Sequence, residues 1–117
     1  MSAPQTHALS AIAFQLAATL ETYQADVDLL VGRGFDPEIY RRVSAHIDQM
    51  RMYAAALPVL SVAWVEVMIR HFELTHGMWR QQKQPEGSAD ELSRLHASLD
   101  EAVGRLSAKC VQLIPAG

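Results

Sequence analysis

Apolar residues recur at three- and four-residue steps along almost the whole of this 117-residue sequence. This spacing places them on one face of an α-helix, because a helix turns by about 100° per residue. No segment shows the two-residue alternation of a half-buried strand. The first predicted helix runs from about Thr6 to Val31, and its inward stripe is Leu9, Ile12, Ala13, Leu16, Leu20, Tyr23, Val27 and Leu30.

Glycine and proline mark where this first helix ends and where the second begins. Gly32 and Gly34 suit a helix C-terminus, since glycine adopts the left-handed conformation with little strain. Asp36 offers a side-chain cap, and Pro37 fits the first helical position because an N–H there would have no helical partner. The residues that the second helix is predicted to bury are Ile39, Val43, His46, Met50, Tyr53 and Leu57.

Pro58 decides how the second and third helices are connected. It lies in an apolar run, residues 53–69, with no Gly, Asn or Asp beside it, which is poor turn chemistry. Either the chain turns sharply and Pro58 opens a third helix, or one long helix kinks at Pro58 and the protein has three helices. We expect the turn.

The third helix is predicted from about Val59 to Gln82. Its polar edge is narrow, so we expect it to be the most buried helix. Residues 81–88 form the clearest loop, and Ser88 and Glu91 then match a capping box that opens the fourth helix. Pro115 ends that helix, whose apolar stripe is Leu92, Leu95, Leu99, Val103, Leu106, Cys110 and Leu113.

Together these segments predict an all-α protein, an antiparallel four-helix bundle that forms a single domain over residues 1–117. The net charge of −3 comes without a basic face, which argues against nucleic acid as a partner. The apolar run is shorter than the ~20 residues of a spanning helix and contains Pro58, so we expect no stable membrane insertion. The single cysteine and the lack of a basic signal region favour the cytoplasm.

The predicted helices carry more apolar residues than the interior of one bundle needs. A stripe about 100° wide suffices for each helix of a lone bundle, yet the third helix is apolar on nearly three sides. The first helix has a second face of small and apolar residues. This surplus predicts a protein partner, most often a second copy of the chain. The candidate contacts are Phe14, Ala18, Ala25, Trp64 and Trp79.

The stretch HFELTHGMW, residues 71–79, holds the most concentrated potential ligands. His71 and His76 lie about 140° apart around a straight helix, so they cannot coordinate the same metal ion. Glu73 and His76 form a Glu-x-x-His step, the ligand pair of di-iron bundles. Such a site needs a second step and two further glutamates, and this sequence has only one step.

A second histidine set depends on the turn at Pro58. His46 lies twelve residues before Pro58 and His71 thirteen after it, so an antiparallel hairpin would bring them level within ~2 Å. His96 would lie a few residues from that level. These histidines suit a metal ion or a haem held by imidazoles. The commoner outcome for a buried histidine is to stay neutral and hydrogen-bond a hydroxyl or a carbonyl. The available hydroxyl partners are Tyr23, Tyr53, Thr75 and Ser44.

The segment AHIDQMR around His46 resembles a histidine phosphotransfer domain in architecture only, with a histidine on the second long helix. That family places Lys and Gly at the third and fourth positions after its histidine, where this chain has Gln49 and Met50. No Gly-rich phosphate loop or Ser-His-Asp arrangement occurs. The sequence therefore predicts a non-catalytic, self-associating interaction module without a cofactor. The alternatives are a metal or haem bundle using His46, His71, Glu73, His76 and His96, and then a phosphotransfer domain.

Overall fold

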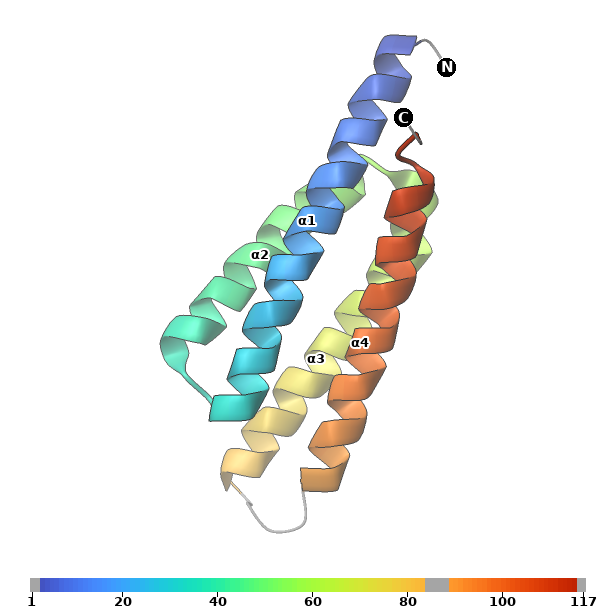
Figure 1. The fold of residues 1–117 in the computed structure, drawn as a ribbon. Helices are drawn as coiled ribbons and strands as arrows, with labels where there is room; N and C mark the ends of the chain where they lie inside the picture. Colours follow the sequence, from blue (N-terminus) through green and yellow to red (C-terminus); the bar gives the residue numbers. More distant parts are fainter. Residues whose placement is uncertain (1–2, 84–88, 116–117) are drawn as a thin grey trace.

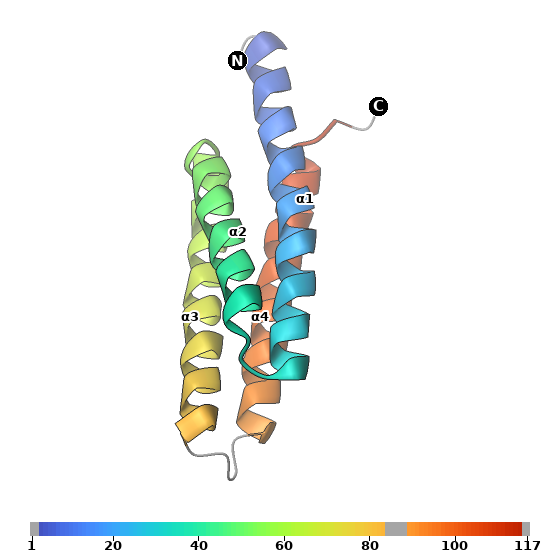
Figure 2. The same ribbon diagram turned by 90° about the vertical axis from the view of Figure 1, so that its left-hand side faces the viewer.

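The computed structural model describes residues 3–83 and 89–115, and these form an all-α four-helix bundle, as predicted (Figure 1). The helices are α1 (Ala3–Arg33), α2 (Pro37–Ala55), α3 (Ser61–Lys83) and α4 (Ala89–Gln112). A short 3-10 helix, η1 (Pro58–Leu60), lies between α2 and α3. Figure 2 shows α2 and α3 on one side of the molecule and α1 and α4 on the other, with the start of α1 projecting beyond the bundle.

The connection between α1 and α2 follows the local chemistry that the sequence predicts. Gly34 has a φ of 84°, the left-handed region in which glycine is favoured. The Asp36 side chain accepts hydrogen bonds from the backbone N–H groups of Glu38 and Ile39, and Pro37 takes the first position of α2. The predicted cap at Ser88 falls outside the described residues.

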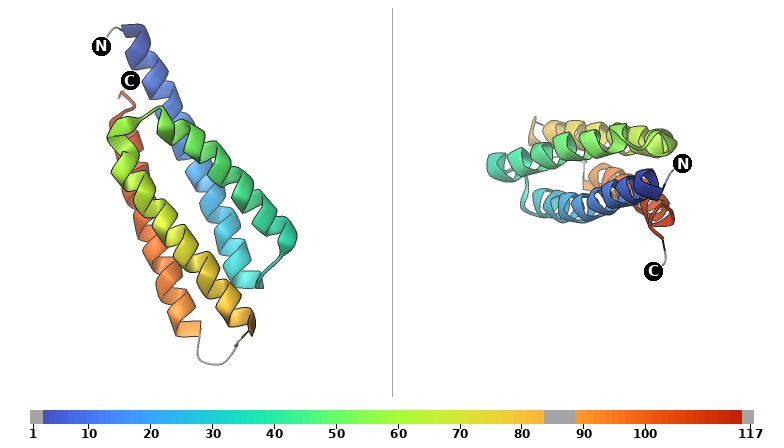
Figure 3. Two further views of the ribbon diagram at one scale, coloured as in Figure 1. Left: turned by 180° about the vertical axis from the view of Figure 1, so that it is seen from behind. Right: turned by 90° about the horizontal axis from the view of Figure 1, so that it is seen from above.

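The chain turns at Pro58 and does not continue as one kinked helix. Pro58 opens η1, which leads directly into α3. The chain bends by 119° between α2 and the η1–α3 segment, which is well short of the reversal in a closed hairpin. The left view of Figure 3 shows that the gap between α2 and α3 widens with distance from this turn.

The hydrophobic core lies where α1 packs on α2 and α4, and where α3 packs on α4. The predicted stripe of α1 is confirmed as its buried face, with Leu9 and Ile12 partly buried at its upper end. The face of α2 is turned slightly from the prediction. Ile47 and Ala54 are buried, whereas His46 and Tyr53 lie at the edge of the core. The difference arises because α2 packs mainly on α1 and diverges from α3.

Among the four helices α3 has the smallest share of exposed residues, as expected, but its exposed part is not confined to the narrow polar edge that the sequence predicts. One of its faces is in the core and includes Val67, His71 and Leu74, but another apolar face is exposed to solvent. In a closed bundle α2 would cover part of α3, and the divergence at Pro58 removes that cover. Gly77 is buried close to Leu95 of α4.

Within the described ranges, no single helix has both the length and the apolar character needed to cross a membrane. Only α2 taken together with η1 and α3 reaches that length and composition, and the chain is bent by 119° between them.

Candidate interaction surface

A row of exposed side chains runs along α3 for five turns of the helix. Their spacing alternates between three and four residues, so they share one face. We call this row the α3 surface, and its members are Val62, Val65, Ile69, Phe72, His76 and Trp79.

The α3 surface is unusual because its exposed apolar residues are contiguous. The five apolar members expose from 50 to 82% of their surface. Single exposed apolar side chains are common on soluble proteins, but a continuous apolar row marks an interaction site in most cases. The row is therefore the strongest candidate for a functional surface within the described residues.

An aromatic cavity of about 480 Å³ adjoins the lower half of the α3 surface. Phe35 and Tyr40 form its wall at the beginning of α2, with their ring centroids 5.3 Å apart. The opposite wall belongs to α3 and includes Phe72, His76 and Trp79. The cavity lies between the beginning of α2 and the second half of α3, so it extends the apolar row sideways.

Charged side chains border the α3 surface and are paired within the chain. Arg70 donates to Glu73 at 2.9 Å, one turn along the same helix. Glu66 pairs with Arg105 of α4. This edge therefore carries both signs of charge beside an apolar row, as the rim of a protein interface does.

The predicted partner contacts fall into three groups. Trp79 lies on the α3 surface, as a contact residue should. Trp64 is half-buried and packs against the core, which leaves it little surface for a partner. The predicted contacts on α1 are exposed, but they are not part of the α3 surface. They are Phe14, Ala18 and Ala25.

Five members of the α3 surface were not among the predicted contacts, namely Val62, Val65, Ile69, Phe72 and His76. Their spacing is visible in the sequence. The same spacing predicts burial in the bundle equally well, so the sequence alone does not separate a core face from an exposed one.

His71 takes the structural role that was the alternative to ligand binding. Its side chain is buried, with 6% of the residue exposed, and its Nδ1 is hydrogen-bonded to the Tyr23 hydroxyl at 2.8 Å. Burial lowers the pKa of His71 to about 4 and raises the pKa of the Tyr23 phenol. Both groups are therefore neutral at pH 7, and the pair joins α1 to α3 inside the core.

His46 belongs to a second polar cluster, between α1 and α2. Its Nε2 donates to Asp26 at 2.8 Å, and Arg42 donates to the other carboxylate oxygen at 3.0 Å. The hydrogen bond from Arg42 is the main reason why the pKa of Asp26 is lowered, and the bond from His46 acts in the same direction against the effect of burial. This buried carboxylate therefore accepts hydrogen bonds from two side chains of α2.

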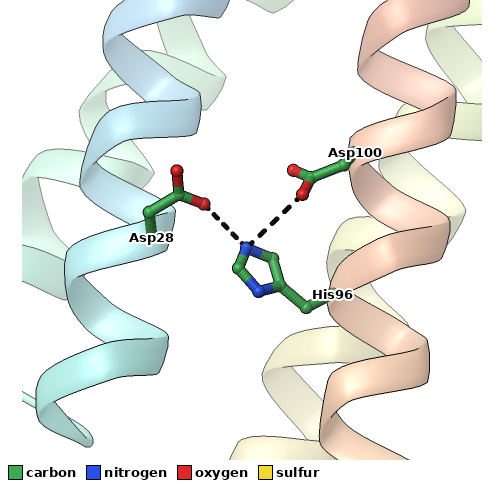
Figure 4. Close-up of side chains that lie close together, drawn as sticks. All are labelled: Asp28, His96 and Asp100. Carbon is green, nitrogen blue, oxygen red and sulfur yellow. Dashed lines mark hydrogen bonds and ion pairs between the residues drawn. The ribbon is translucent and has the colours of Figure 1, made fainter.

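His96 belongs to a third cluster, between α4 and α1 (Figure 4). Its Nε2 donates to Asp28 of α1 at 2.7 Å and lies 3.8 Å from Asp100, one turn along α4. Gln24 donates to the other oxygen of Asp100 at 3.0 Å. In the described part of the chain, Asp28, His96 and Asp100 are the only three potential ligands whose donor atoms lie within 4.8 Å of one another.

Of the five predicted ligand residues, His96 alone lies in that group of three. His71 and His46 use a ring nitrogen to bind Tyr23 and Asp26, one turn apart on α1. Glu73 pairs with Arg70, and His76 lines the aromatic cavity.

The chain matches no protein-family model, no curated protein and no solved structure.

Proposed function

We propose that the protein is a non-catalytic interaction module whose α3 surface binds an apolar face of another protein chain. The observation that carries this proposal is the continuous row of exposed apolar residues from Val62 to Trp79. Burying such a row gives the favourable free energy of association, and the charged edge beside it supplies orientation. Binding to the α3 surface would also cover the aromatic cavity.

Two further observations support a binding role without catalysis. The perturbed groups Tyr23, His71 and Asp26 lie in structural pairs between helices, and none of them lines the aromatic cavity. The one cysteine, Cys110, is buried, and burial raises the pKa of its thiol to about 11, which disfavours a nucleophilic thiolate. A buried free thiol is also consistent with the expected reducing compartment, the cytoplasm.

Photo-crosslinking in cells that make the protein tests this function. Phe72 on α3 and Phe14 on α1 form a matched pair, because they expose 61% and 59% of their surface. We expect p-benzoylphenylalanine at position 72 to give a covalent protein adduct and the same group at position 14 to give none. The adduct at position 72 should disappear when Ile69→Glu is added. Equal adducts from both positions, or none from position 72 in folded protein, would contradict the proposal.

A second candidate function is the binding of a divalent cation by Asp28, His96 and Asp100. Histidine nitrogen and carboxylate oxygen are zinc ligands, and three protein ligands leave the remaining coordination positions to water. The cation would replace the proton on Nε2 of His96 that now makes the hydrogen bond to Asp28. The specific observation in favour is that the three donor atoms lie within 4.8 Å of one another and come from two helices.

Titration calorimetry with zinc chloride tests this second candidate. We expect one zinc ion to bind per chain and the binding heat to be lost in His96→Gln, because the only nitrogen ligand is removed. His76→Gln is the matched control, since His76 is exposed but lies on α3 outside the cluster. Zinc binding that survives in His96→Gln would rule the site out.

A further inference from the structure

We propose that the partner of the α3 surface is the α3 surface of a second copy of this chain, and that the two helices run antiparallel. This inference rests on the proposed function and names its partner. It is carried by the spacing of the exposed row, the sizes of its side chains, the charges beside it and its area.

The spacing of the α3 surface is that of a helix–helix seam. Residues 62, 65, 69, 72, 76 and 79 occupy the a and d positions of consecutive heptads without interruption. An apolar row with this 3.5-residue period packs along its whole length against one other helix. A membrane-binding helix instead has a broad apolar face with basic residues on its polar side, whereas this edge includes Glu66 and Glu73.

The sizes of the side chains favour an antiparallel pair. The three members nearest the start of α3 are β-branched aliphatic residues, Val62, Val65 and Ile69, and the three that follow carry rings. An antiparallel second copy places Val62 against Trp79, Val65 against His76, and Ile69 against Phe72. Each layer then combines one smaller with one larger side chain, so the combined size of the two side chains is similar in all layers. A parallel pair would stack Trp79 on Trp79 at one end and leave Val62 against Val62 at the other.

The charges on the edge are compatible with that register. The twofold axis of the antiparallel pair passes between Arg70 and His71, so Arg70 lies within about 3 Å of the axial level of Glu73 of the second copy. Each Arg70 can then share its charge between the Glu73 of its own helix and that of the other. The other edge of the row carries Met68 and Thr75, which add no charge to the seam.

The area is sufficient for a specific dimer. The exposed fractions of the five apolar members of the α3 surface correspond to roughly 600 Å² of surface per chain. Two copies would therefore bury roughly 1,200 Å², the lower end of the range for stable protein–protein interfaces.

Light scattering on the purified 117-residue chain tests the second copy as partner. We expect twice the 13.0 kDa mass of one chain at micromolar protein. The double substitution Ile69→Glu and Phe72→Glu should raise the dissociation constant roughly 100-fold or more, because it puts charges at the centre of the seam. Both positions are exposed in the single chain, so the helical circular dichroism should be unchanged. The matched control Phe14→Glu should leave the dimer mass unchanged.

Cysteine crosslinking tests the orientation. Val62→Cys and Trp79→Cys are made in separate chains, and Cys110 gives little background because its thiol is buried. In the antiparallel pair only the mixture of the two variants forms a disulfide dimer efficiently. Efficient dimers from each variant alone would show a parallel pair and overturn the orientation.

The outcomes separate this inference from the proposed function. A 13.0 kDa monomer whose position 72 still crosslinks to a different protein overturns the second copy and keeps the interaction module. A monomer that instead binds lipid vesicles, or that gives no adduct at position 72, overturns both. If Phe14→Glu dissociates the dimer and the α3 double substitution does not, the surface of self-association lies on α1 and not on α3.

Discussion

The free energy of unfolding is expected to fall by about 3 kcal/mol as the pH is lowered from 6.5 to about 4, because of His71 alone. In the folded protein, burial lowers the pKa of His71 from 6.5 to about 4, while the unfolded chain keeps the ordinary value. Between these two pH values the unfolded state binds more protons, so stability rises with pH. The contribution is fully present above pH 6.5 and is lost as the pH falls through this window.

Urea unfolding at a series of pH values measures this effect, and His71→Asn is the control. Asparagine does not titrate, and its side-chain oxygen can take the place of Nδ1 beside the Tyr23 hydroxyl. The variant should be less stable at pH 7 but should lose less stability on acidification. Asp26 titrates outside the pH range of this comparison. Its pKa is lowered from 3.8 in the folded protein, so its contribution to the free energy of unfolding is lost at pH values below 3.8. Parallel curves for the two proteins would refute the role of His71.

The second large effect is expected from Asp26→Ala, which should lower the free energy of unfolding by about 2 kcal/mol at neutral pH. Asp26 is buried and accepts hydrogen bonds from both Arg42 and His46, so its removal leaves two α2 side chains without their partner. The value allows for the exposure of Arg42, whose charge is partly screened by water.

Asp48→Ala is the matched control for this substitution. Asp48 also pairs with an arginine, Arg51, but its side chain is 74% exposed, so we expect a loss below about 0.5 kcal/mol. Chemical denaturation of the three proteins provides the comparison. Equal losses from the two substitutions would mean that the burial of Asp26 adds nothing to its ion pair.

The helices were predictable because their determinants are local. The stripe of α1 and the Asp36–Pro37 start of α2 depend on residues that are near neighbours in sequence. The exposure of α3 depends instead on the angle at which α2 leaves the Pro58 turn. No local pattern fixes that angle, and for this reason the sequence did not show that an apolar face of α3 is exposed.

The same distinction separates the predictable and unpredictable parts of the polar clusters. His96 and Asp100 lie four residues apart on one helix, so their proximity is visible in the sequence. Asp28 joins them from a position 68 residues before His96, which only the packing of α1 on α4 determines. Tyr23 was among the expected hydroxyl partners of a buried histidine, and the structure confirms that it binds His71.

The pattern of helix packing has a consequence for how the chain assembles. Each of the two closest pairs, α1 with α2 and α3 with α4, consists of consecutive helices, and local contacts of this kind favour rapid folding. The two hairpins must then dock in one register, although apolar helix faces alone could slide past each other by a turn. Tyr23, Gln24 and Asp28 on α1 each bind a residue of the second hairpin. Less than two turns of α1 thus set the alignment of one half of the molecule on the other.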